Sequence, residues 1–239
     1  MKDIKILAVE SSCDETAVAV VENGNKILSS VVATQIDVHK DFGGVIPEVA
    51  SRIHVENISM VIEEALKKAE LDMPDIDAVA FTQGPGLVGC LHIGVQAAKT
   101  LAWAFDKPLV PVHHIAGHIY ANRFLTDLAF PLLALVVSGG HTELVYMKDE
   151  WSFQILGTTQ DDAIGEAGDK VGRVLGLPYP GGVYVDKLAK EGKPIYTLSK
   201  PKTEQALDFS FSGLKSSVLQ FIDRQKRQGL EFNAADRKS

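Results

Sequence analysis

Cysteine, positive charge and long apolar runs are all scarce in this chain of 239 residues. The two cysteines, Cys13 and Cys90, are far apart in the sequence, so there is no cysteine framework of the kind that staples small exported domains. No secretory segment is present, and no apolar stretch is long enough to span a bilayer. These absences predict a cytoplasmic protein that does not enter a membrane.

An excess of positive charge is also missing. Lysine and arginine total 24 against 31 acidic residues, which gives a formal net charge of −7. A chain that bound nucleic acid unaided would usually carry a basic excess. Basic residues do collect late in the sequence, and this pattern taken alone favours a solvated face over a binding surface. They are Lys187, Lys190, Lys193, Lys200, Lys202, Lys215, Arg224, Lys226 and Arg227.

What the sequence does contain is an orderly series of strands and helices in its first half. Alternating apolar runs and an Asn-Gly turn predict a meander of three strands, followed by alternating helices and strands. The strands are expected at Ile4–Val9, Ala17–Val21, Lys26–Val32, Ile76–Thr82 and Leu109–Val112. Helices are expected after Pro47 and over Val88–Phe105; the second lacks a polar face and is therefore predicted to be buried. This order predicts a parallel strand pair added to the meander.

A second meander begins after Pro131, and helices follow it. The strands are expected at Leu132–Val137, Thr142–Met147 and Phe153–Gly157, and the helices around Ala163–Leu175 and Val183–Glu191. Both meanders read as an apolar strand, a turn of small hydroxyl residues and a strand opened by threonine, which indicates an internal repeat. We therefore expect an α/β protein of two lobes, residues 1–128 and 129–239, whose small-residue turns present N–H groups to a phosphate-bearing ligand in one cleft.

The end of the sequence indicates a truncated chain. Asn233-Ala234-Ala235-Asp236 resembles a helix start, yet the chain ends at Ser239 before two helical turns can form. We expect the second lobe to lack its final elements.

Two histidines are spaced for metal binding. His114 and His118 are four residues apart, hence on one helix face, directly after a strand. The alternative is that both histidines form hydrogen bonds within the protein at a helix start and bind no metal. Ile115 occupies the position of the glutamate in the H-E-x-x-H protease motif, so the base of that mechanism is missing. A third metal ligand must come from elsewhere.

Other polar or glycine-rich segments, each taken alone, give only a weak indication of function. Gly84–Gly89 fits G-x-G-x-x-G, but the next strand ends in histidines rather than in a ribose-binding acid, which favours a tight strand-to-helix connection. Cys13-Asp14-Glu15 reads as a solvated turn, although its carboxylates could act on a metal or water. Asp161–Lys170 places acids at a helix start. Tyr179–Gly182 is a glycine turn, and Asp208–Lys215 fits no element.

Taken together these segments resemble the TsaD transferases, a family of enzymes of tRNA threonylcarbamoyladenosine synthesis once labelled O-sialoglycoprotein endopeptidases. The motifs are Glu10–Thr16 (ESSCDET), His39–His54 (HKDFGGVIPEVASRIH), Gly84–Gly89, His113–His118, Ser138–Thr142 (SGGHT), Asp161–Lys170, Tyr179–Gly182 and Asp208–Lys215 (DFSFSGLK). The resemblance implies a duplicated actin/Hsp70-like ATPase (ribonuclease H-like) fold. The chain departs from the family pattern at Ala116, where many relatives have glutamate, and at Gly168, where relatives have an aromatic residue.

The resemblance also implies a reaction. A threonylcarbamoyl group would pass from threonylcarbamoyl-adenylate to the exocyclic amine of the adenosine beside the anticodon, in tRNAs that read ANN codons. Asp14 and Glu15 would lie near the reacting group, and His114 and His118 would bind iron or zinc with a third ligand outside this chain. The residues implied for the adenylate are Val136, Val137, Ser138, Gly139, Gly140, Asp169, Gly182 and Asp186.

The resemblance further implies a complex. The partners would be a TsaB-type paralogue, as a heterodimer through the first lobe, and a TsaE-type ATPase that brings ATP and Mg²⁺. Partners of this kind could supply the positive surface that tRNA needs. Two other functions stay open: a metal-dependent peptidase or glycopeptidase, and a non-catalytic scaffold.

Overall fold

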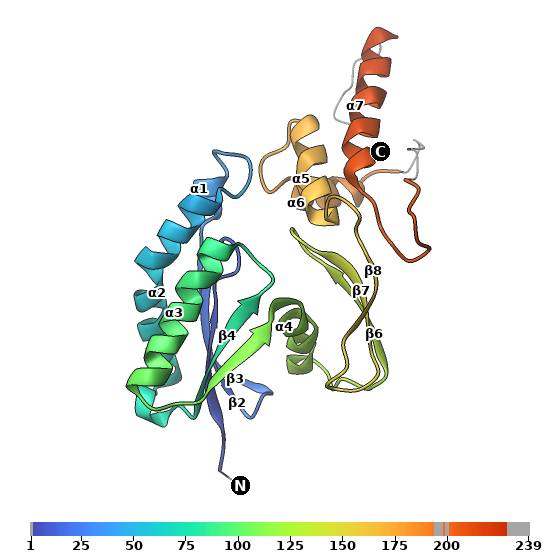
Figure 1. Ribbon diagram of the computed structural model, residues 1–239. Coiled ribbons are helices and arrows are strands. Elements are labelled where there is room, and N and C mark those ends of the chain that lie inside the picture. The colour runs from blue at the N-terminus through green and yellow to red at the C-terminus, as the bar shows by residue number, and fades with distance from the viewer. Residues whose placement is uncertain (1, 194–197, 199–200, 229–239) are drawn as a thin grey trace. The chain divides into compact units, whose positions relative to one another are not determined.

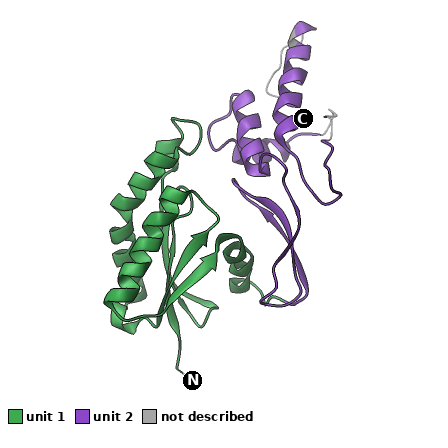
Figure 2. Ribbon diagram, viewed as in Figure 1, with its two compact units in different colours: residues 1–128 green, residues 129–239 purple. Residues whose placement is uncertain are grey.

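The computed structural model describes residues 2–193, 198 and 201–228, and the chain forms two compact units, Met1–Leu128 and Ala129–Ser239. Figure 2 colours the two units, and Figure 1 labels their elements. The helix start expected at Asn233–Asp236 lies outside the described residues. Among the described residues, no helix combines the length and the apolar character needed to cross a membrane.

A five-stranded mixed sheet forms the centre of the first unit, in the order β3-β2-β1-β4-β5. The strands are β1 (Lys5–Glu10), β2 (Glu15–Glu22), β3 (Lys26–Thr34), β4 (Ala78–Gly84) and β5 (Leu109–His113). β1, β2 and β3 pair antiparallel as a meander, whereas β4 pairs parallel with both β1 and β5. The predicted meander and the predicted parallel pairing are therefore confirmed.

Alternation of side chains explains why the opening segment forms strands. Leu7 and Val9 of β1, and Val18 and Val20 of β2, are at most 2% exposed, while their neighbours along each strand point to the other face. The turn between β2 and β3 has positive φ at both Asn23 and Gly24. This is the backbone conformation that an Asn-Gly hairpin turn requires.

Two long helices, α2 (Pro47–Ala69) and α3 (Val88–Ala104), lie side by side on one face of this sheet (Figure 1). The buried face of α2 is the one that its apolar spacing predicts. It consists of Ala50, His54, Ile58, Val61, Ile62 and Ala65. α2 starts at Pro47, whose missing N–H costs nothing in a first helical turn.

The prediction that the helix over Val88–Phe105 is buried all round is wrong. α3 buries only a stripe of small residues at four-residue spacing, Cys90, Gly94, Ala98 and Ala102. Val88 and Trp103 on its outer side are 83% and 85% exposed. The stripe allows close packing on the sheet and α2, and Ile93, Val95 and Leu101 beside it are partly buried against the core.

Short helices complete the first unit. α1 (Ile36–His39) and the 3₁₀ turn η1 (Met73–Asp75) join strands to helices, and neither was predicted. α4 (His114–Tyr120) follows β5 without an intervening loop, and η2 (Ala121–Phe124) continues it. Because β5 leads straight into α4, His114 stands at the carboxyl end of a parallel strand.

The second unit contains an antiparallel meander and three helices. β6 (Leu132–Val137), β7 (Thr142–Met147) and β8 (Gln154–Thr158) pair in that order, which confirms the second predicted meander. Helices α5 (Ile164–Val174) and α6 (Gly181–Ala189) were predicted, whereas α7 (Ser212–Arg227) was not. α5 and α6 approach closely because both carry glycine: a Cβ on Gly172 would lie 2.6 Å from Cα of Gly181.

The segment Asp208–Lys215, which fitted no element by sequence, docks α7 onto the sheet. Phe209 bonds through its backbone to Thr158 and Gln160 at the end of β8. The carboxylate of Asp161 accepts hydrogen bonds from the backbone N–H groups of Phe211 and Ser212 and from the hydroxyls of Ser210 and Ser212. Asp161 therefore caps the first turn of α7.

Replacement of Asp161 with alanine should loosen α7. The cap is expected to contribute about 1 kcal/mol, within the range for helix caps. Burial acts to raise the pKa of Asp161, but the hydrogen bonds outweigh it and hold the pKa below its ordinary value. The cap is therefore intact above ~pH 4, the ordinary value, and is lost as the pH falls through the lowered pKa.

Amide hydrogen exchange in the first turns of α7 measures this loss. Asp149→Ala removes the same charge from a turn that does not touch α7 and serves as the control. Equal protection of α7 in Asp161→Ala and in the wild type would contradict the capping role.

Candidate functional site

Polar side chains gather where β1, β4 and β5 end. β1 ends at Glu10, Thr82 lies near the end of β4, and β5 is followed at once by His114. Parallel strands bring their carboxyl ends to one edge of the sheet, which is where open α/β folds place their ligands. Topology therefore brings together residues up to 104 positions apart in the sequence.

The carboxylate of Glu10 is the hub of this edge. It accepts hydrogen bonds from the backbone N–H of Ser12 and the hydroxyl of Thr82, and its Oε2 lies 3.2 Å from Nδ1 of His114. Burial acts to raise the pKa of Glu10, but hydrogen bonds, first from His114 and then from Ser12 and Thr82, outweigh it and lower the pKa to about 2. Glu10 is therefore a carboxylate at neutral pH.

Glu10 fixes which nitrogen of His114 is available. A carboxylate accepts from Nδ1–H, so Nε2 of the neutral ring carries the lone pair, and Ser12 Oγ lies 3.3 Å from the same Nδ1. Metal-binding histidines commonly have such an orienting carboxylate. The sequence analysis missed this role of Glu10, although the odd position of a charge at the end of an apolar strand could have indicated it.

His114 and His118 are brought together as predicted. Their Nε2 atoms are 3.1 Å apart, and their rings meet edge to face with centroids 4.5 Å apart. Two imidazole nitrogens bound to one zinc-like ion would be separated by about 2.8–3.4 Å, given metal–nitrogen bonds of about 2.0–2.1 Å. The pair therefore fits a shared cation. Within the described residues, no group of three or more His, Cys, Asp or Glu side chains is placed to hold a metal, so the pair is a partial ligand set.

The acidic turn Cys13-Asp14-Glu15 follows directly on this edge. Burial raises the pKa of Glu15, and the neighbouring charges of Asp14 and Glu10 raise it further. Burial, together with the carboxylate of Asp14, also raises the pKa of the Cys13 thiol to about 12. This edge of the sheet thus combines one carboxylate that stays ionised, Glu10, with one that holds its proton more firmly, Glu15, a contrast typical of acid–base sites.

The loop Gly84–Gly89 packs under the same strand end. A Cβ on Gly86 would lie 2.7 Å from the carbonyl oxygen of Ser12, so glycine is needed for the approach. The backbone N–H of Leu87 donates to that oxygen at 2.7 Å. This contact is what a tight strand-to-helix connection provides, and it agrees with the interpretation of the loop as structural.

In the second unit, the turn Ser138–His141 between β6 and β7 is the counterpart of the acidic turn. Ser138 closes it, with its N–H donating to the carbonyl of His141 and its Oγ accepting from the N–H of His141. A Cβ on Gly139 or Gly140 would meet nothing within 4 Å, so the backbone here is open to a ligand. Of the two preceding residues, Val136 is 7% exposed and Val137 is 55% exposed.

The other residues implied for the adenylate lie on α5 and α6. Asp169 Oδ1 accepts a hydrogen bond from the N–H of Gly182 at 3.0 Å, which joins these two residues. Asp186 lies one turn further along α6 and forms an ion pair with Lys190 at 2.7 Å. Glu166 also pairs with a lysine of its own helix, Lys170.

Turn and helix meet through Gly165. Its N–H donates to the carbonyl of Ser138 at 3.3 Å, and Thr142 Oγ1 accepts from the N–H of Ile164 at 2.9 Å. The start of α5 is therefore fixed against the turn Ser138–His141. In both units, small residues at a strand end are held by the backbone of the following helix or loop.

These features define a class before any comparison: an α/β protein with two meander-based units, each with a polar turn at the end of its first strand. Among solved structures, component A of (R)-2-hydroxyglutaryl-CoA dehydratase from Acidaminococcus fermentans has a TM-score of 0.50 at 12% identity, over 97% of this chain and 70% of that chain. This likeness concerns the fold alone, which is the actin/Hsp70-like ATPase fold.

Sequence comparison gives the family. The family model TsaD, tRNA N6-adenosine threonylcarbamoyltransferase, matches residues 26–236. Proteins with that name from Bacillus thuringiensis (strain Al Hakam) and Listeria monocytogenes serovar 1/2a are 60% and 61% identical to it over 236 residues. Each match covers 98% of this chain and 69% of the relative. The chain belongs to the tRNA N6-adenosine threonylcarbamoyltransferase family.

The junction at Gly165 yields a stability prediction. In Gly165→Ala the new Cβ would lie 2.6 Å from the carbonyl oxygen of Ser138 and 2.8 Å from Cα of Gly139, so backbone must move. We expect a loss of ~1–3 kcal/mol in the free energy of unfolding by urea. The control is Gly139→Ala, whose Cβ enters open space and should cost little. Equal stabilities of the two variants would contradict the close packing of turn and helix.

Proposed function

We propose that this chain is the catalytic subunit that transfers a threonylcarbamoyl group from threonylcarbamoyl-adenylate to the exocyclic amine of the adenosine beside the tRNA anticodon. Its family membership supports the reaction, and the convergence of Glu10, His114 and His118 at one sheet edge supports a reactive centre in this chain. The second observation carries the proposal that the chain is catalytic rather than only structural.

The chemistry has one bond made and one broken. The amine nitrogen attacks the carbamoyl carbon, the bond from that carbon to the phosphate oxygen breaks, and the adenylate leaves as AMP. The amine must also lose a proton. We assign Glu15 as its acceptor, with Asp14 beside it; the raised pKa of Glu15 supports this role because a general base works best when its pKa approaches the working pH.

The adenylate would bind in the second unit. The open backbone at Gly139 and Gly140, after Val136, Val137 and Ser138, suits the approach of a phosphate. Asp169 and Gly182, already joined by a hydrogen bond, would border the ribose side with Asp186.

A divalent metal, iron or zinc, would be held by His114 and His118, with a third ligand from outside the chain. When bound, such an ion supplies Lewis-acid polarisation and orientation of a bound oxygen. The protein's own part is to hold the His114 ring through the contact of its Nδ1 with the carboxylate of Glu10, so that Nε2 of His114 faces Nε2 of His118.

Partners are part of the same proposal. The net charge of −7 makes an unaided grip on tRNA unfavourable, so positive surface from a TsaB-type paralogue and a TsaE-type ATPase, with ATP and Mg²⁺, is expected to complete the complex. We place this complex in the cytoplasm. A metal-dependent peptidase is less well supported because Ile115 replaces the catalytic glutamate of the protease motif.

The direct test is to incubate tRNA with the chain, its two partner proteins, threonylcarbamoyl-adenylate and ATP, and then to analyse the nucleosides of the tRNA. Formation of threonylcarbamoyladenosine that depends on this chain is the expected result. Cleavage of casein or a glycoprotein without any tRNA product would favour the peptidase instead. Product formed equally well by His114→Ala and Glu15→Gln chains would favour a scaffold.

Glu15→Gln should lower the rate of transfer by about 10²–10⁴-fold, the usual contribution of a general base. Because the pKa of Glu15 is raised, the wild-type rate should fall on the acid side at a pH above the ordinary glutamate value of ~4.3. A pH–rate profile under saturating tRNA measures this limb. An unchanged rate in Glu15→Gln would contradict the assignment of the base.

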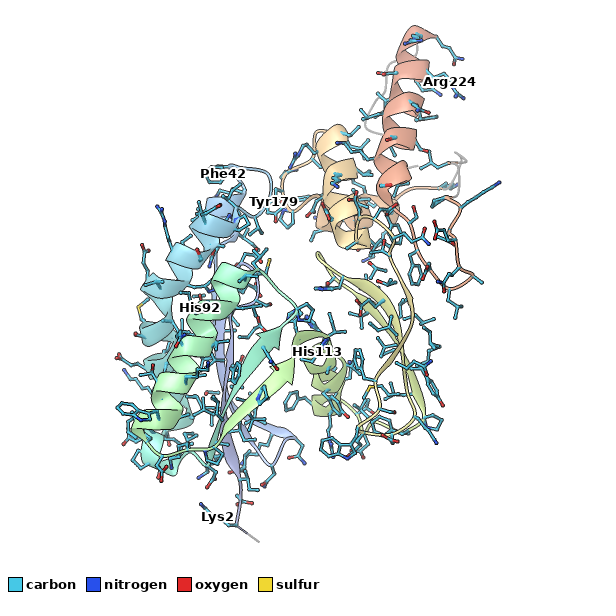
Figure 3. The ribbon with its side chains drawn as sticks, viewed as in Figure 1. Lys2, Phe42, His92, His113, Tyr179 and Arg224 are labelled. Atoms are coloured by element: carbon cyan, nitrogen blue, oxygen red, sulfur yellow. The ribbon has the colours of Figure 1, made fainter. Side chains whose placement is uncertain are left out.

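Metal affinity tests the histidine pair without any activity assay. Titration of the chain with Zn²⁺ in a calorimeter should show that His118→Ala abolishes binding and that Glu10→Ala weakens it about 10–100-fold, as for other orienting carboxylates. His92→Ala is the control, since His92 lies on the exposed side of α3 (Figure 3) and bonds only to Gln96 among the contacts described. Equal affinities of His118→Ala and His92→Ala would refute the site.

A further inference from the structure

A third histidine near the candidate site is fully buried and has no part in the proposed chemistry. His54 lies on α2 and is 0% exposed, and its ring contacts the acidic turn. Its Nε2 is 3.0 Å from the carbonyl oxygen of Cys13, and its Nδ1 is 2.7 Å from Oγ1 of Thr16, which is also 0% exposed. The imidazole thus spans the turn that carries Asp14 and Glu15.

The two partners of His54 determine its state. A carbonyl oxygen can only accept, so Nε2 carries the hydrogen and donates to Cys13. In the neutral ring Nδ1 is then the acceptor for the hydroxyl of Thr16. Each contact is therefore directional, and the ring cannot flip without leaving a buried group unpaired.

A second buried group holds the next carbonyl of the same turn. The backbone N–H of Gln35 donates to the carbonyl of Asp14 at 3.0 Å. The side chain of Gln35, 2% exposed, is fixed between Nε2 of His39 at 3.0 Å and the carbonyl of Ala50 at 3.3 Å. Nδ1 of His39 in turn accepts from the N–H of Ile46. Successive carbonyls of the turn are thus tied to α1 and α2.

We propose that His54 is a positioning residue that, together with Gln35, holds the backbone of Cys13 and Asp14 so that the carboxylates of Asp14 and Glu15 are presented at the edge of the sheet. The effect of this positioning on catalysis rests on the function proposed above, whereas the positioning of the backbone by His54 does not depend on that function.

The contrast with ordinary core residues supports a directional role. Val61, on the same helix and 3% exposed, contributes apolar packing that any similar volume could supply. His54 instead uses both ring nitrogens on one short stretch, Cys13–Thr16, where the connection from β1 enters β2. A residue chosen for packing alone would carry no such polar pairing in a fully buried position.

Three substitutions distinguish the hydrogen bonds of His54 to the turn from its contribution to core packing. In His54→Gln the side-chain amide can reach the place of the imidazole Nε2 and donate to Cys13. In His54→Asn the shorter side chain reaches only the side of Thr16. Val61→Ala is the control that destabilises the same helix without touching the turn.

The reactivity of Cys13 reports on the turn. Cys13 is exposed and its pKa is raised to about 12, whereas Cys90 is buried and reacts only when the unit opens. Release of the turn should let the Cys13 thiol return toward an ordinary pKa. We expect His54→Asn to raise the rate of Cys13 alkylation by iodoacetamide at pH 8 by at least about tenfold, with Cys90 unreacted, and His54→Gln and Val61→Ala to stay near the wild-type rate.

Two results would overturn the proposal. One is an unchanged Cys13 rate in His54→Asn. The other is a rise in His54→Asn that Val61→Ala matches, because the turn would then respond to helix stability alone. If His54→Asn does not fold, long-range ¹H–¹⁵N NMR of the wild-type chain decides instead: the proposal requires hydrogen on Nε2 of His54, and hydrogen on Nδ1 would exclude it.

A loss of transfer tests the link to catalysis separately. If the complex transfers threonylcarbamoyl, His54→Asn should lower kcat with little change in KM for tRNA, and His54→Gln should restore most of the rate. If no complex of this chain transfers the group, the alkylation result still supports the positioning role while the proposed function fails.

Discussion

The hydrogen bond between Glu10 and His114 is the interaction on which the candidate site depends. It joins the ends of β1 and β5, which are separated by β4, and it sets the tautomer of the histidine that faces His118. A buried carboxylate without partners would prefer to be neutral, but the donors around Glu10 lower its pKa to about 2 and keep it charged. The carboxylate can therefore orient the ring at any ordinary pH.

The same strand end organises the rest of the first unit. Ser11 bonds to α3 through Cys90 and Gly94, Ser12 meets the loop at Gly86, and the following carbonyls are held from α1 and α2. The hydroxyls of Ser11 and Thr16 are both used in contacts with the helices, which explains why small hydroxyl residues occur there. In the second unit, Ser138 and Thr142 do the same for the turn between β6 and β7 and for its contact with the start of α5.

Much of the fold could be predicted from the sequence because its strands alternate clearly and its turns carry Asn-Gly or glycine pairs. The two meanders, the parallel pairing and the face of α2 were all predicted, whereas α3 was wrongly expected to be buried. Its periodic small residues, Gly94 and Ala98 among them, were obscured by apolar residues on the outer face. α7 was missed because its cap, Asp161, lies about 50 residues earlier in the sequence. The pairing of His114 with His118 follows from helix geometry, but the part played by Glu10 depends on strand order, which local patterns do not contain.

The most direct test of the account is the state of the two imidazoles in long-range ¹H–¹⁵N NMR spectra, recorded as Zn²⁺ is added. We predict hydrogen on Nδ1 of His114 before the metal is added, and a simultaneous shift of the Nε2 signals of His114 and His118 as it binds. Hydrogen on Nε2 of His114 in the metal-free chain, or a response of only one of the two rings, would contradict the claim that Glu10 orients His114 so that it shares one cation with His118.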